Sequence, residues 1–484
     1  MTDAPTDASG GAAEDPAGEQ VAPPIPFGVR ADTGETPPLL TDADLSRIAP
    51  APPAEPHLGV VASIIDPTDL TQTGWGIVFS RDVNPAIRQK LTRLIERRRQ
   101  QVDNPELFRI FDGADGVRAG ESAENWLFRH GLALGPVEPE NGVPYYLIIV
   151  GSPEEISLAF QSTLDLHFCI GRLYFDDVND YETYANHVVD YETAATLPHR
   201  RQAAVWMTRN KNDDATLMLS GILGAAFTAK PLGQGPRFKG IEYQTTSFLN
   251  DAATRENLLT LLRGVPGGGP PALLFTGSHG LEWKASEPDV QRQNQGALVT
   301  SAWVKGTPVA RDQFVSGDDV PPDAQLAGTM CFMFACFGGA CPLVDSYRLS
   351  PTGDPLPLAP KPFITNLPQR LLRAGALAVL AHCDRAWSYG FVSGGGVRQD
   401  QLIRGAVEGL MRGQPAGRCA DQFQDQWGAL SAQYSLRLDS RRNGTQPVST
   451  DALANLAIAR DDARNYIVLG DPAARLRIKD MAPA

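Results

Sequence analysis

The sequence predicts an α/β fold with a mostly parallel sheet, and three observations support this. Short apolar runs of strand type alternate along the chain with longer segments whose apolar residues recur at helical spacing. Runs such as WGIVF (75–79) and YYLIIV (145–150) read as buried strands. The chain has 484 residues, of which 42% are hydrophobic, so it carries enough apolar material for a large core and is not globally disordered.

Composition divides the chain into three predicted parts. Residues 1–57 form a flexible tail rich in Pro, Ala and acidic residues, because their first 56 positions hold 11 of the 39 prolines and ten acidic residues against two basic ones. Residues 58–199 form an N-terminal α/β subdomain, and residues 200–484 form a second, larger α/β domain. Within the tail, Val21–Leu40 carries several apolar residues among its prolines. It is either an untethered linker or a segment that lies extended across a folded surface.

The first series of elements runs from residue 58 to residue 199. In the segment Pro85–Gln100, a proline at the first turn and apolar residues at helical spacing favour a helix. The elements in order are a strand at Trp75–Phe79, a helix at Pro85–Gln100, strands at Tyr145–Val150 and Phe168–Tyr174, and a helix at Tyr181–Glu192.

The second series follows the same alternation. Its elements are strands at Ala203–Thr208 and Gly240–Ser247, a helix at Ala252–Arg263 ended by Gly264, a strand at Pro271–Thr276, a strand at Thr329–Ala335, a helix at Leu367–Ala376, a strand at Leu377–His382 and a closing segment at Arg464–Ile478.

Charge and hydropathy exclude several classes of protein. The formal net charge of −13 argues against a nucleic-acid-binding surface, which needs clustered Lys and Arg. The chain has no apolar run long enough to span a membrane, and its start lacks the features of a signal peptide, so we expect a cytoplasmic location. Six cysteines in 484 residues do not make a disulfide framework.

Two strands of the second series end in reactive side chains. His279-Gly280 follows the strand at Pro271–Thr276, and Cys336 follows the strand at Thr329–Ala335. Functional groups gather at the carboxyl ends of strands in open α/β sheets, so two adjacent parallel strands would bring this histidine and cysteine together. An imidazole that raises the thiolate fraction of a cysteine makes it a nucleophile towards acyl carbons.

Glycines beside both residues suit the same chemistry. Gly280 allows its backbone N–H to approach a developing oxyanion, and the N–H of Cys336 is the second candidate donor. Gly338 and Gly339 allow a tight turn after Cys336. The alternative for each residue taken alone is structural, because a cysteine at the end of an apolar strand is most often a small buried hydrophobe.

Other groupings are weaker. Cys331, Cys336 and Cys341 fit no common zinc spacing, so no metal site and no cofactor are predicted. In His382-Cys383-Asp384, adjacent residues of a strand point to opposite faces and do not easily form a catalytic pair. Asp384 and Glu282 are candidates to orient His279.

The motifs LLFTGSHG (273–280) and FACFGGA (334–340) resemble the catalytic pair of clan CD cysteine peptidases, which include caspases, clostripain, gingipains and CHAT peptidases. Ile170–Glu192 and Tyr466–Leu476, with its GDP sequence, look like gingipain-type segments that flank the catalytic domain. The order and rough spacing are those of the caspases, whose histidine lies about 50 residues upstream of the cysteine.

This resemblance implies a caspase-like three-layer α/β/α domain preceded by a smaller α/β subdomain. It implies that His279 is the general acid/base, that Cys336 is the nucleophile, and that the N–H groups of Gly280 and Cys336 form the oxyanion hole. The sequence departs from the caspase pattern after Cys336, where Phe337-Gly338-Gly339 replaces the Arg-Gly of caspases. Caspase-type cleavage after aspartate therefore does not carry over.

In this family the loop after the first catalytic strand helps to form the pocket for the substrate residue before the scissile bond (P1). Here that loop is Arg209–Asp214. Asp213 or Asp214 would favour a basic P1 side chain, and Arg209 an acidic one. The alternative is that Asp213 or Asp214 simply caps the following helix.

The function predicted from the sequence is a cysteine endopeptidase that cleaves protein substrates through His279 and Cys336. Two alternatives stay open: a catalytically silent protein-binding module, and a hydrolase or acyltransferase that acts on small amides with the same pair. A protein or peptide substrate is the expected partner, with no nucleic acid and no membrane. Activation by loop cleavage, or by an activating protein or protease, is also left open.

Overall fold

The computed structural model describes residues 25–36, 65–350, 352–393 and 396–483. Most of the predicted tail, residues 1–24 and 37–57, lies outside the described residues. Residues 25–36 of that tail are described, and Phe27 and Val29 among them are fully buried. Of the two interpretations of Val21–Leu40, the described part therefore fits a segment that lies on a folded surface.

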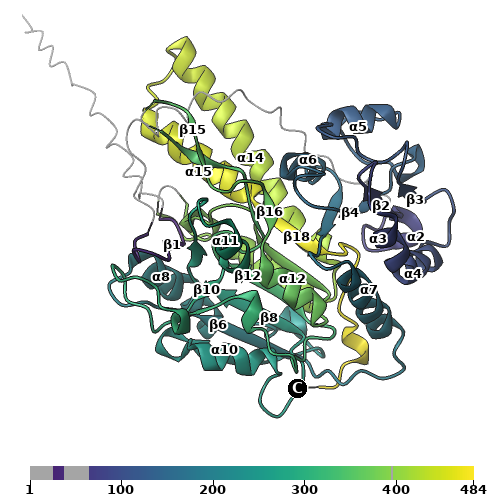
Figure 1. The fold of residues 1–484 in the computed structure, drawn as a ribbon, viewed down its shortest axis with the longest axis horizontal. Helices are drawn as coiled ribbons and strands as arrows, with labels where there is room; N and C mark the ends of the chain where they lie inside the picture. The colour runs from purple at the N-terminus through teal and green to yellow at the C-terminus, as the bar shows by residue number, and fades with distance from the viewer. Residues whose placement is uncertain (1–24, 37–64, 351, 394–395, 484) are drawn as a thin grey trace, which may run out of the picture.

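A ten-stranded sheet forms the centre of the molecule (Figure 1). Its strand order is β3-β2-β4-β5-β18-β17-β12-β8-β6-β7. The strands are β2 (Trp75–Phe79), β3 (Phe108–Phe111), β4 (Tyr146–Val150), β5 (Cys169–Leu173), β6 (Gln202–Met207), β7 (Gln244–Leu249), β8 (Leu273–Gly277), β12 (Met330–Phe334), β17 (Ala378–His382) and β18 (Tyr466–Gly470). The predicted α/β fold with a mostly parallel sheet is confirmed.

The sheet consists of two parallel halves that meet at one antiparallel pair. Every neighbouring pair of strands is parallel except β17 and β18, where Ala378 lies opposite Gly470 and His382 opposite Tyr466. The carboxyl ends of β6, β8, β12 and β17 therefore lie together at one edge, whereas those of β2, β4 and β5 lie at the opposite edge.

The two predicted α/β parts share this one sheet. β18, from the end of the chain, lies between β5 of the first part and β17 of the second, with Leu469 opposite Arg172. The predicted boundary at residue 199 lies between β5 and β6, and both of these strands belong to the one continuous sheet. The division into two domains at this residue remains a prediction.

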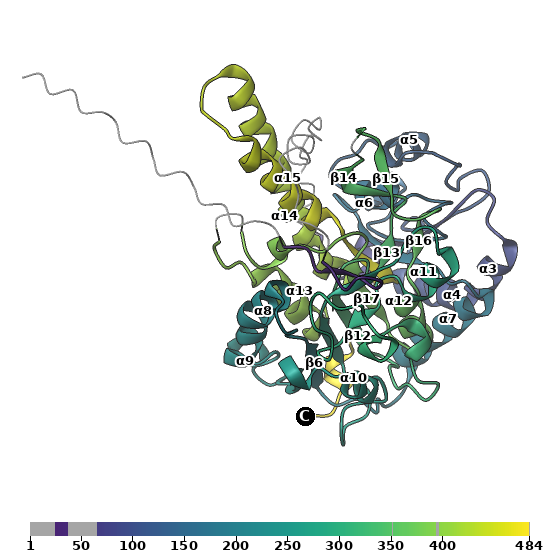
Figure 2. The same cartoon turned by 60° about the vertical axis from the view of Figure 1, so that its left-hand side comes forward.

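Helices cover both faces of the sheet. Figure 2 shows α7 and α12 on one side of the strands and α13 and α14 on the other. The helices are α2 (Leu70–Thr73), α3 (Pro85–Lys90), α4 (Thr92–Val102), α5 (Ala123–Arg129), α6 (Leu158–Leu164), α7 (Val178–Thr193), α8 (Asp214–Leu219), α9 (Ala225–Ala229), α10 (Arg255–Leu262), α11 (Pro288–Asn294), α12 (Asn366–Arg373), α13 (Gln401–Met411), α14 (Ala416–Asn443) and α15 (Thr450–Arg464).

Local signals explain where several elements begin. Asn84 caps α3 through Ala86 N–H, with Pro85 at the first position, and Asp177 caps α7 through Asn179 N–H. The helix predicted at Pro85–Gln100 is divided at Leu91 into α3 and α4. The strand predicted at Gly240–Ser247 lies further along the chain, as β7 (Gln244–Leu249).

Smaller sheets lie outside the central one. A four-stranded sheet has the order β1-β9-β10-β11, and β1 is the part of the N-terminal segment that joins it (purple in Figures 1 and 2). β1 pairs with β9 in parallel, so that Gly28 lies opposite Gly280. The bounds are β1 (Gly28–Arg30), β9 (Gly280–Glu282), β10 (Leu298–Val299), β11 (Phe314–Val315), and the pairs β13 (Ala340–Cys341) with β16 (Phe363–Ile364) and β14 (Val344–Leu349) with β15 (Pro355–Pro357).

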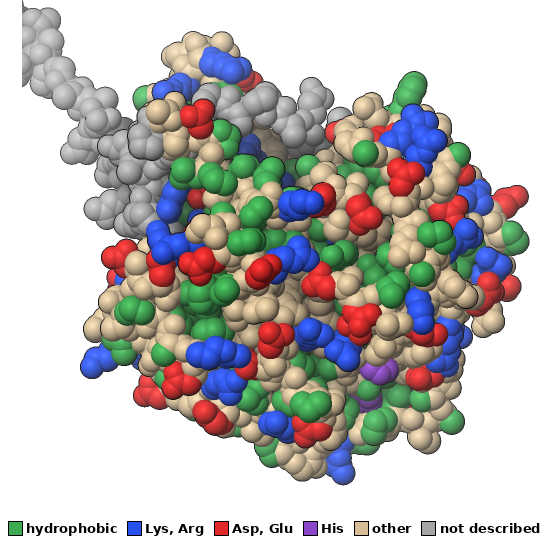
Figure 3. Space-filling view, viewed as in Figure 1, with side chains coloured by type: hydrophobic (Ala, Val, Ile, Leu, Met, Phe, Trp, Pro, Cys, Tyr) green, Lys and Arg blue, Asp and Glu red, His purple; other side chains and the backbone are tan. Residues whose placement is uncertain are grey.

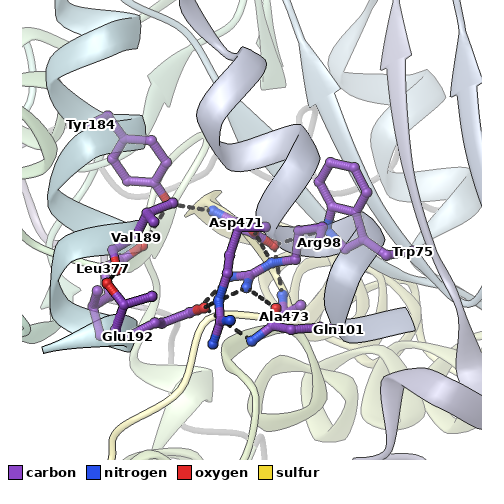
Figure 4. Close-up of polar contacts among 11 residues, drawn as sticks. Trp75, Arg98, Gln101, Tyr184, Val189, Glu192, Leu377, Asp471 and Ala473 are labelled. Carbon is purple, nitrogen blue, oxygen red and sulfur yellow. Dashed lines mark hydrogen bonds and ion pairs between the residues drawn. The ribbon is translucent and has the colours of Figure 1, made fainter. Parts of the chain in front are cut away.

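A buried ionic network joins the C-terminal strand to both parts of the chain (Figure 4). Asp471, directly after β18, accepts hydrogen bonds from Arg98 Nε at 2.8 Å and Trp75 Nε1 at 3.1 Å. Arg98 also pairs with Glu192 of α7 at 2.7 Å. The backbone N–H of Asp471 donates to Tyr184 Oη, which donates in turn to the carbonyl of Leu377 beside β17.

The face of the molecule seen in Figure 3 carries Lys and Arg side chains interspersed with Asp and Glu side chains. Within the described part of the chain, no helix is both long enough and apolar enough to cross a bilayer.

We predict that Asp471→Ala lowers the free energy of unfolding by about 3–5 kcal/mol, because it leaves the buried Arg98 guanidinium without one of its two carboxylates. Urea titration followed by circular dichroism measures this. The control is Asp323→Ala, which breaks an exposed pair with Arg263 and should cost at most about 1 kcal/mol. Equal losses in the two variants would contradict the structural role of Asp471.

Candidate active site

Strand pairing places His279 and Cys336 at one edge of the sheet. β8 and β12 pair in parallel with Gly277 opposite Phe334, and each reactive residue follows its strand end by two positions. The backbone N–H of Ser278 donates to the carbonyl of Phe334, which continues the pairing beyond β8. The two strand ends that the sequence singled out are therefore neighbours in space.

Gly280 lies directly against the backbone of Cys336. A Cβ atom at Gly280 would collide with the carbonyl oxygen of Cys336 and would lie 3.0 Å from its backbone nitrogen. Only glycine fits this approach. The two backbone segments that carry the predicted oxyanion donors are therefore in contact.

Asp213 is the hydrogen-bond partner of His279. Its Oδ2 atom lies 2.9 Å from His279 Nε2, and both side chains are fully buried. The same oxygen accepts from the backbone N–H of Thr216 at 2.9 Å and so caps α8. Asp213 therefore ties the imidazole to the start of a helix.

Electrostatics keep the Asp213 carboxyl ionised. Burial acts to raise the pKa of Asp213, but the charge of His279 and the hydrogen bonds from His279 and Thr216 together hold this pKa below its usual range. His279 Nδ1 is buried and has no hydrogen-bond partner among the described residues. The second ring nitrogen thus remains available for a proton transfer.

The Cys336 thiol is fully buried in this structure. Burial raises the pKa of Cys336, while the Ala386 backbone and the nearby charge of Arg385 act in the opposite direction. The N–H of Ala386 donates to Cys336 Sγ at 3.2 Å. In this covered state the sulfur is held as a thiol, so it needs a base or exposure to water to become a thiolate.

A tight turn follows Cys336, as predicted, but its strained residue is not a glycine. Phe337 adopts a left-handed conformation with φ of 56°, whereas Gly338 and Gly339 do not. The Phe337 N–H donates to the carbonyl of Asp384, and the Gly339 N–H donates to that of His382. These bonds fasten the turn to the end of β17, which compensates for the conformation of Phe337.

The residues predicted to line the P1 pocket separate into two groups. Asp213 is buried at the site as the partner of His279, which also fits the interpretation of this residue as a helix cap. Arg209 and Asp214 are exposed. Of the three, the structure brings only Asp213 to the candidate site.

The weaker candidates have other partners. His382 pairs with Asp462 at 3.3 Å, Asp384 accepts from Ser346, and Glu282 pairs with Arg385. Asp384 and Glu282, the two acidic residues considered as orienting groups for His279, therefore bond to Ser346 and Arg385 instead. The described residues contain no group of His, Cys, Asp or Glu side chains able to hold a metal ion.

The N-terminal segment occupies the site, and the sequence did not predict this. Gly280 N–H donates to the carbonyl of Phe27 at 2.8 Å, and Phe27 N–H donates to the carbonyl of Ala386 at 3.0 Å. Ser388 N–H donates to the carbonyl of Ile25 at 3.2 Å. The apolar residues of Val21–Leu40 were the only sequence signal for this contact.

Comparison with known proteins gives fold likenesses only. No family model matches the chain, and no curated protein matches its sequence. The solved structures that it is similar to include the Arg-specific cysteine proteinase gingipain R, with a TM-score of 0.40 and 12% identity over 84% of this chain and 79% of that chain.

Two further structures are similar. The complex of the Porphyromonas gingivalis RgpB pro- and mature domains gives a TM-score of 0.42 at 11% identity, over 84% of this chain and 80% of that one. Separase in the Saccharomyces cerevisiae separase–securin complex gives 0.31 at 11% identity, over 68% of this chain and 16% of that one. Gingipain is among the peptidases whose motifs the sequence resembles, but at these TM-scores no residue role is transferred.

We predict a pH dependence that comes from Asp384, whose pKa is raised to about 6 by burial and, to a lesser extent, by Asp345, against the charge of Arg385. The folded protein binds this proton up to about pH 6, whereas the unfolded chain releases it near its ordinary pKa of about 4. The contribution of Asp384 to stability is therefore greatest at low pH and falls as the pH rises from about 4 to 6.

Asp384→Asn removes this contribution. The unfolding free energy of wild type minus that of the variant should fall by about 2 kcal/mol between pH 4 and pH 6.5. Guanidinium titrations at several pH values measure it, with the exposed Asp251→Asn as control. A difference that does not change with pH would contradict the assignment.

Proposed function

We propose that this protein is a cysteine peptidase in which Cys336 is the nucleophile, His279 the general acid/base and Asp213 the residue that positions His279. One observation carries the proposal: beside the backbone of Cys336, Gly280 N–H donates to the carbonyl oxygen of a peptide segment, Phe27 of this chain. A backbone donor that meets a peptide carbonyl next to a cysteine and a carboxylate-bound histidine is the arrangement that acyl transfer from a peptide requires.

The first half of the reaction forms an acyl-enzyme. His279 accepts the thiol proton of Cys336, and the sulfur forms a bond to the carbonyl carbon of the substrate. The carbonyl oxygen becomes an oxyanion, which the N–H groups of Gly280 and Cys336 stabilise. When the C–N bond breaks, the protonated His279 gives its proton to the leaving amine, which leaves a thioester on Cys336.

The second half consumes one water molecule. His279 accepts a proton from the water as its oxygen attacks the thioester carbon. The C–S bond then breaks, the carboxylic acid departs, and the proton returns to the sulfur. Asp213 contributes throughout by fixing the ring orientation and by stabilising the imidazolium, while it stays ionised itself.

Hydrolysis of fluorogenic peptides varied at P1 tests this proposal. Cys336→Ala and His279→Ala should each abolish turnover, because each removes a group that bonds to a reacting atom. Cys331→Ala is the matched control for the cysteine, since it removes a buried free thiol from β12, the strand that Cys336 follows. His187→Ala, on α7, is the control for the histidine. Turnover that survives in Cys336→Ala would contradict the proposal.

Asp213→Asn isolates the positioning role. Asparagine still caps α8, so the variant should stay folded, which a melting curve verifies, although it loses the stability that the ionised carboxylate contributes beside His279. Loss of the carboxylate should lower kcat by about 10²-fold with little change in KM, because the imidazolium forms only during the reaction. A rise in KM at unchanged kcat would instead indicate a substrate-binding role for Asp213.

The two alternative functions correspond to other outcomes of the same assay. A protein that binds peptides but cleaves none under any condition would be a catalytically silent binding module. Cys336-dependent cleavage that is confined to small amides would indicate a hydrolase or acyltransferase for small molecules.

A further inference from the structure

The N-terminal segment lies in the candidate site in the manner of an extended substrate. Ile25 and Phe27 bond to the loop after β17 in an antiparallel pattern: Phe27 N–H to Ala386 O, and Ser388 N–H to Ile25 O. Pro26 forms an antiparallel bridge with Trp387 between them. This is the backbone pairing by which an added strand gains affinity for an open edge.

The Phe27 carbonyl is bound where the proposed mechanism places the carbonyl of a substrate. It accepts a hydrogen bond from Gly280 N–H, the donor that the proposed mechanism aims at the oxyanion. The Ala386 carbonyl that accepts from Phe27 N–H also lies 3.6 Å from Cys336 Sγ. In the proposed mechanism the position of the Phe27 carbonyl is that of the acyl group to be attacked, and the bond that corresponds to the scissile one is Phe27–Gly28.

The Phe27 side chain fills an aromatic pocket. It is fully buried, and its ring lies 4.9 Å from that of Phe334, 5.8 Å from that of Phe391 and 5.9 Å from that of His279. The ring contacts with Phe334 and Phe391 are edge-to-face, which is a favourable geometry for aromatic pairs. Such walls favour an uncharged ring or a large aliphatic side chain over a charged one, which would be desolvated without a partner.

The charged residues of the loop Arg209–Asp214 do not line the pocket around the Phe27 ring. Asp213 is already bonded to His279 and Thr216, and Arg209 and Asp214 are exposed. The pocket that holds the Phe27 ring is therefore built from aromatic side chains of β12 and of the loop after β17.

The segment is also held beyond Gly28. Gly28–Arg30 pairs with β9 over Gly280–Glu282, and the side chain of Val29 is fully buried against Leu281 and its neighbours. Arg30 pairs with Asp32, which also pairs with Lys284 at 2.6 Å. Contacts on both sides of the Phe27–Gly28 bond hold the segment in the site, where His279 and Cys336 are fully buried.

We infer that Ile25–Phe27 is an internal mimic of the substrate: the enzyme cleaves after a large apolar residue, aromatic above all, and this segment competes with substrates for the site. The inference rests on the proposed cysteine peptidase function. It replaces a charged P1 preference, which the loop Arg209–Asp214 suggested, with an apolar one. The fraction of molecules open to substrate is set by how often the segment leaves the site.

The test uses the full chain and acetyl-Ile-Pro-X-aminomethylcoumarin, with X as Phe, Leu, Arg or Asp. Phe27→Ala removes the ring that anchors the segment, Phe27→Leu keeps an apolar anchor, and Phe128→Ala is the matched control at a phenylalanine that is 81% exposed. Melting curves of all four proteins verify that each variant is folded.

We expect Phe27→Ala to hydrolyse the Phe substrate about 10²-fold better in kcat/KM than the Arg or Asp substrate. Its kcat/KM for the Phe substrate should exceed that of wild type by about tenfold or more, whereas Phe27→Leu and Phe128→Ala should stay near wild type. Preference for Arg or Asp, or equal activity of Phe27→Ala and wild type, would overturn the inference and leave the peptidase proposal standing.

A second measurement separates the two proposals where no substrate is cleaved. Iodoacetamide labelling of Cys336, followed by peptide mass mapping, does not depend on catalysis. Faster labelling in Phe27→Ala than in wild type and Phe128→Ala would support the covering role of the segment, even with the peptidase proposal contradicted. Equal labelling rates in all three proteins would overturn the covering role.

Discussion

The parallel, in-register pairing of β8 with β12 is the constraint on which the candidate site depends. It places Gly277 opposite Phe334, so that the residues after both strands emerge at the same edge. His279-Gly280 and Cys336 then meet without being close in sequence, and the glycine allows the two backbones to touch. A shift of one residue in this register would turn one reactive side chain to the other face of the sheet.

The two halves of the sheet meet at β18, and a second close approach of two backbones, between β5 and the end of β18, occurs there. Gly171 of β5 lies against the carbonyl of Gly470 and the ring of Pro472, where a Cβ atom would collide. Asp471, which lies between Gly470 and Pro472 in the chain, accepts hydrogen bonds from the side chains of Arg98 and Trp75. Gly171 and the GDP sequence (470–472) are thus in contact, and this contact helps to hold β18 between β5 and β17.

Much of the fold could be predicted from the sequence, because the buried strands of this sheet consist of short runs of apolar residues. The strand at Trp75–Phe79 was predicted to the residue. α14 (Ala416–Asn443) was missed, since glycines and polar residues interrupt its buried positions along its 28 residues. For the candidate site, the closeness of the strand ends before His279 and Cys336 could be predicted, because both residues follow apolar strand-type runs. The contacts of Asp213 with His279 and of Phe27 with Gly280 join residues far apart in the chain, and such contacts leave no periodic pattern.

The most direct test of the account is labelling with an acetyl-Ile-Pro-Phe ketone that carries a leaving group, so that only a thiolate beside a bound acyl site is alkylated. All six cysteines are free and buried in this structure, so exposure alone does not select one of them. The account predicts a single adduct, on Cys336, formed faster in Phe27→Ala than in wild type and lost in His279→Ala. Adducts spread over several cysteines, or a Cys336 adduct that persists at the same rate without His279, would contradict it.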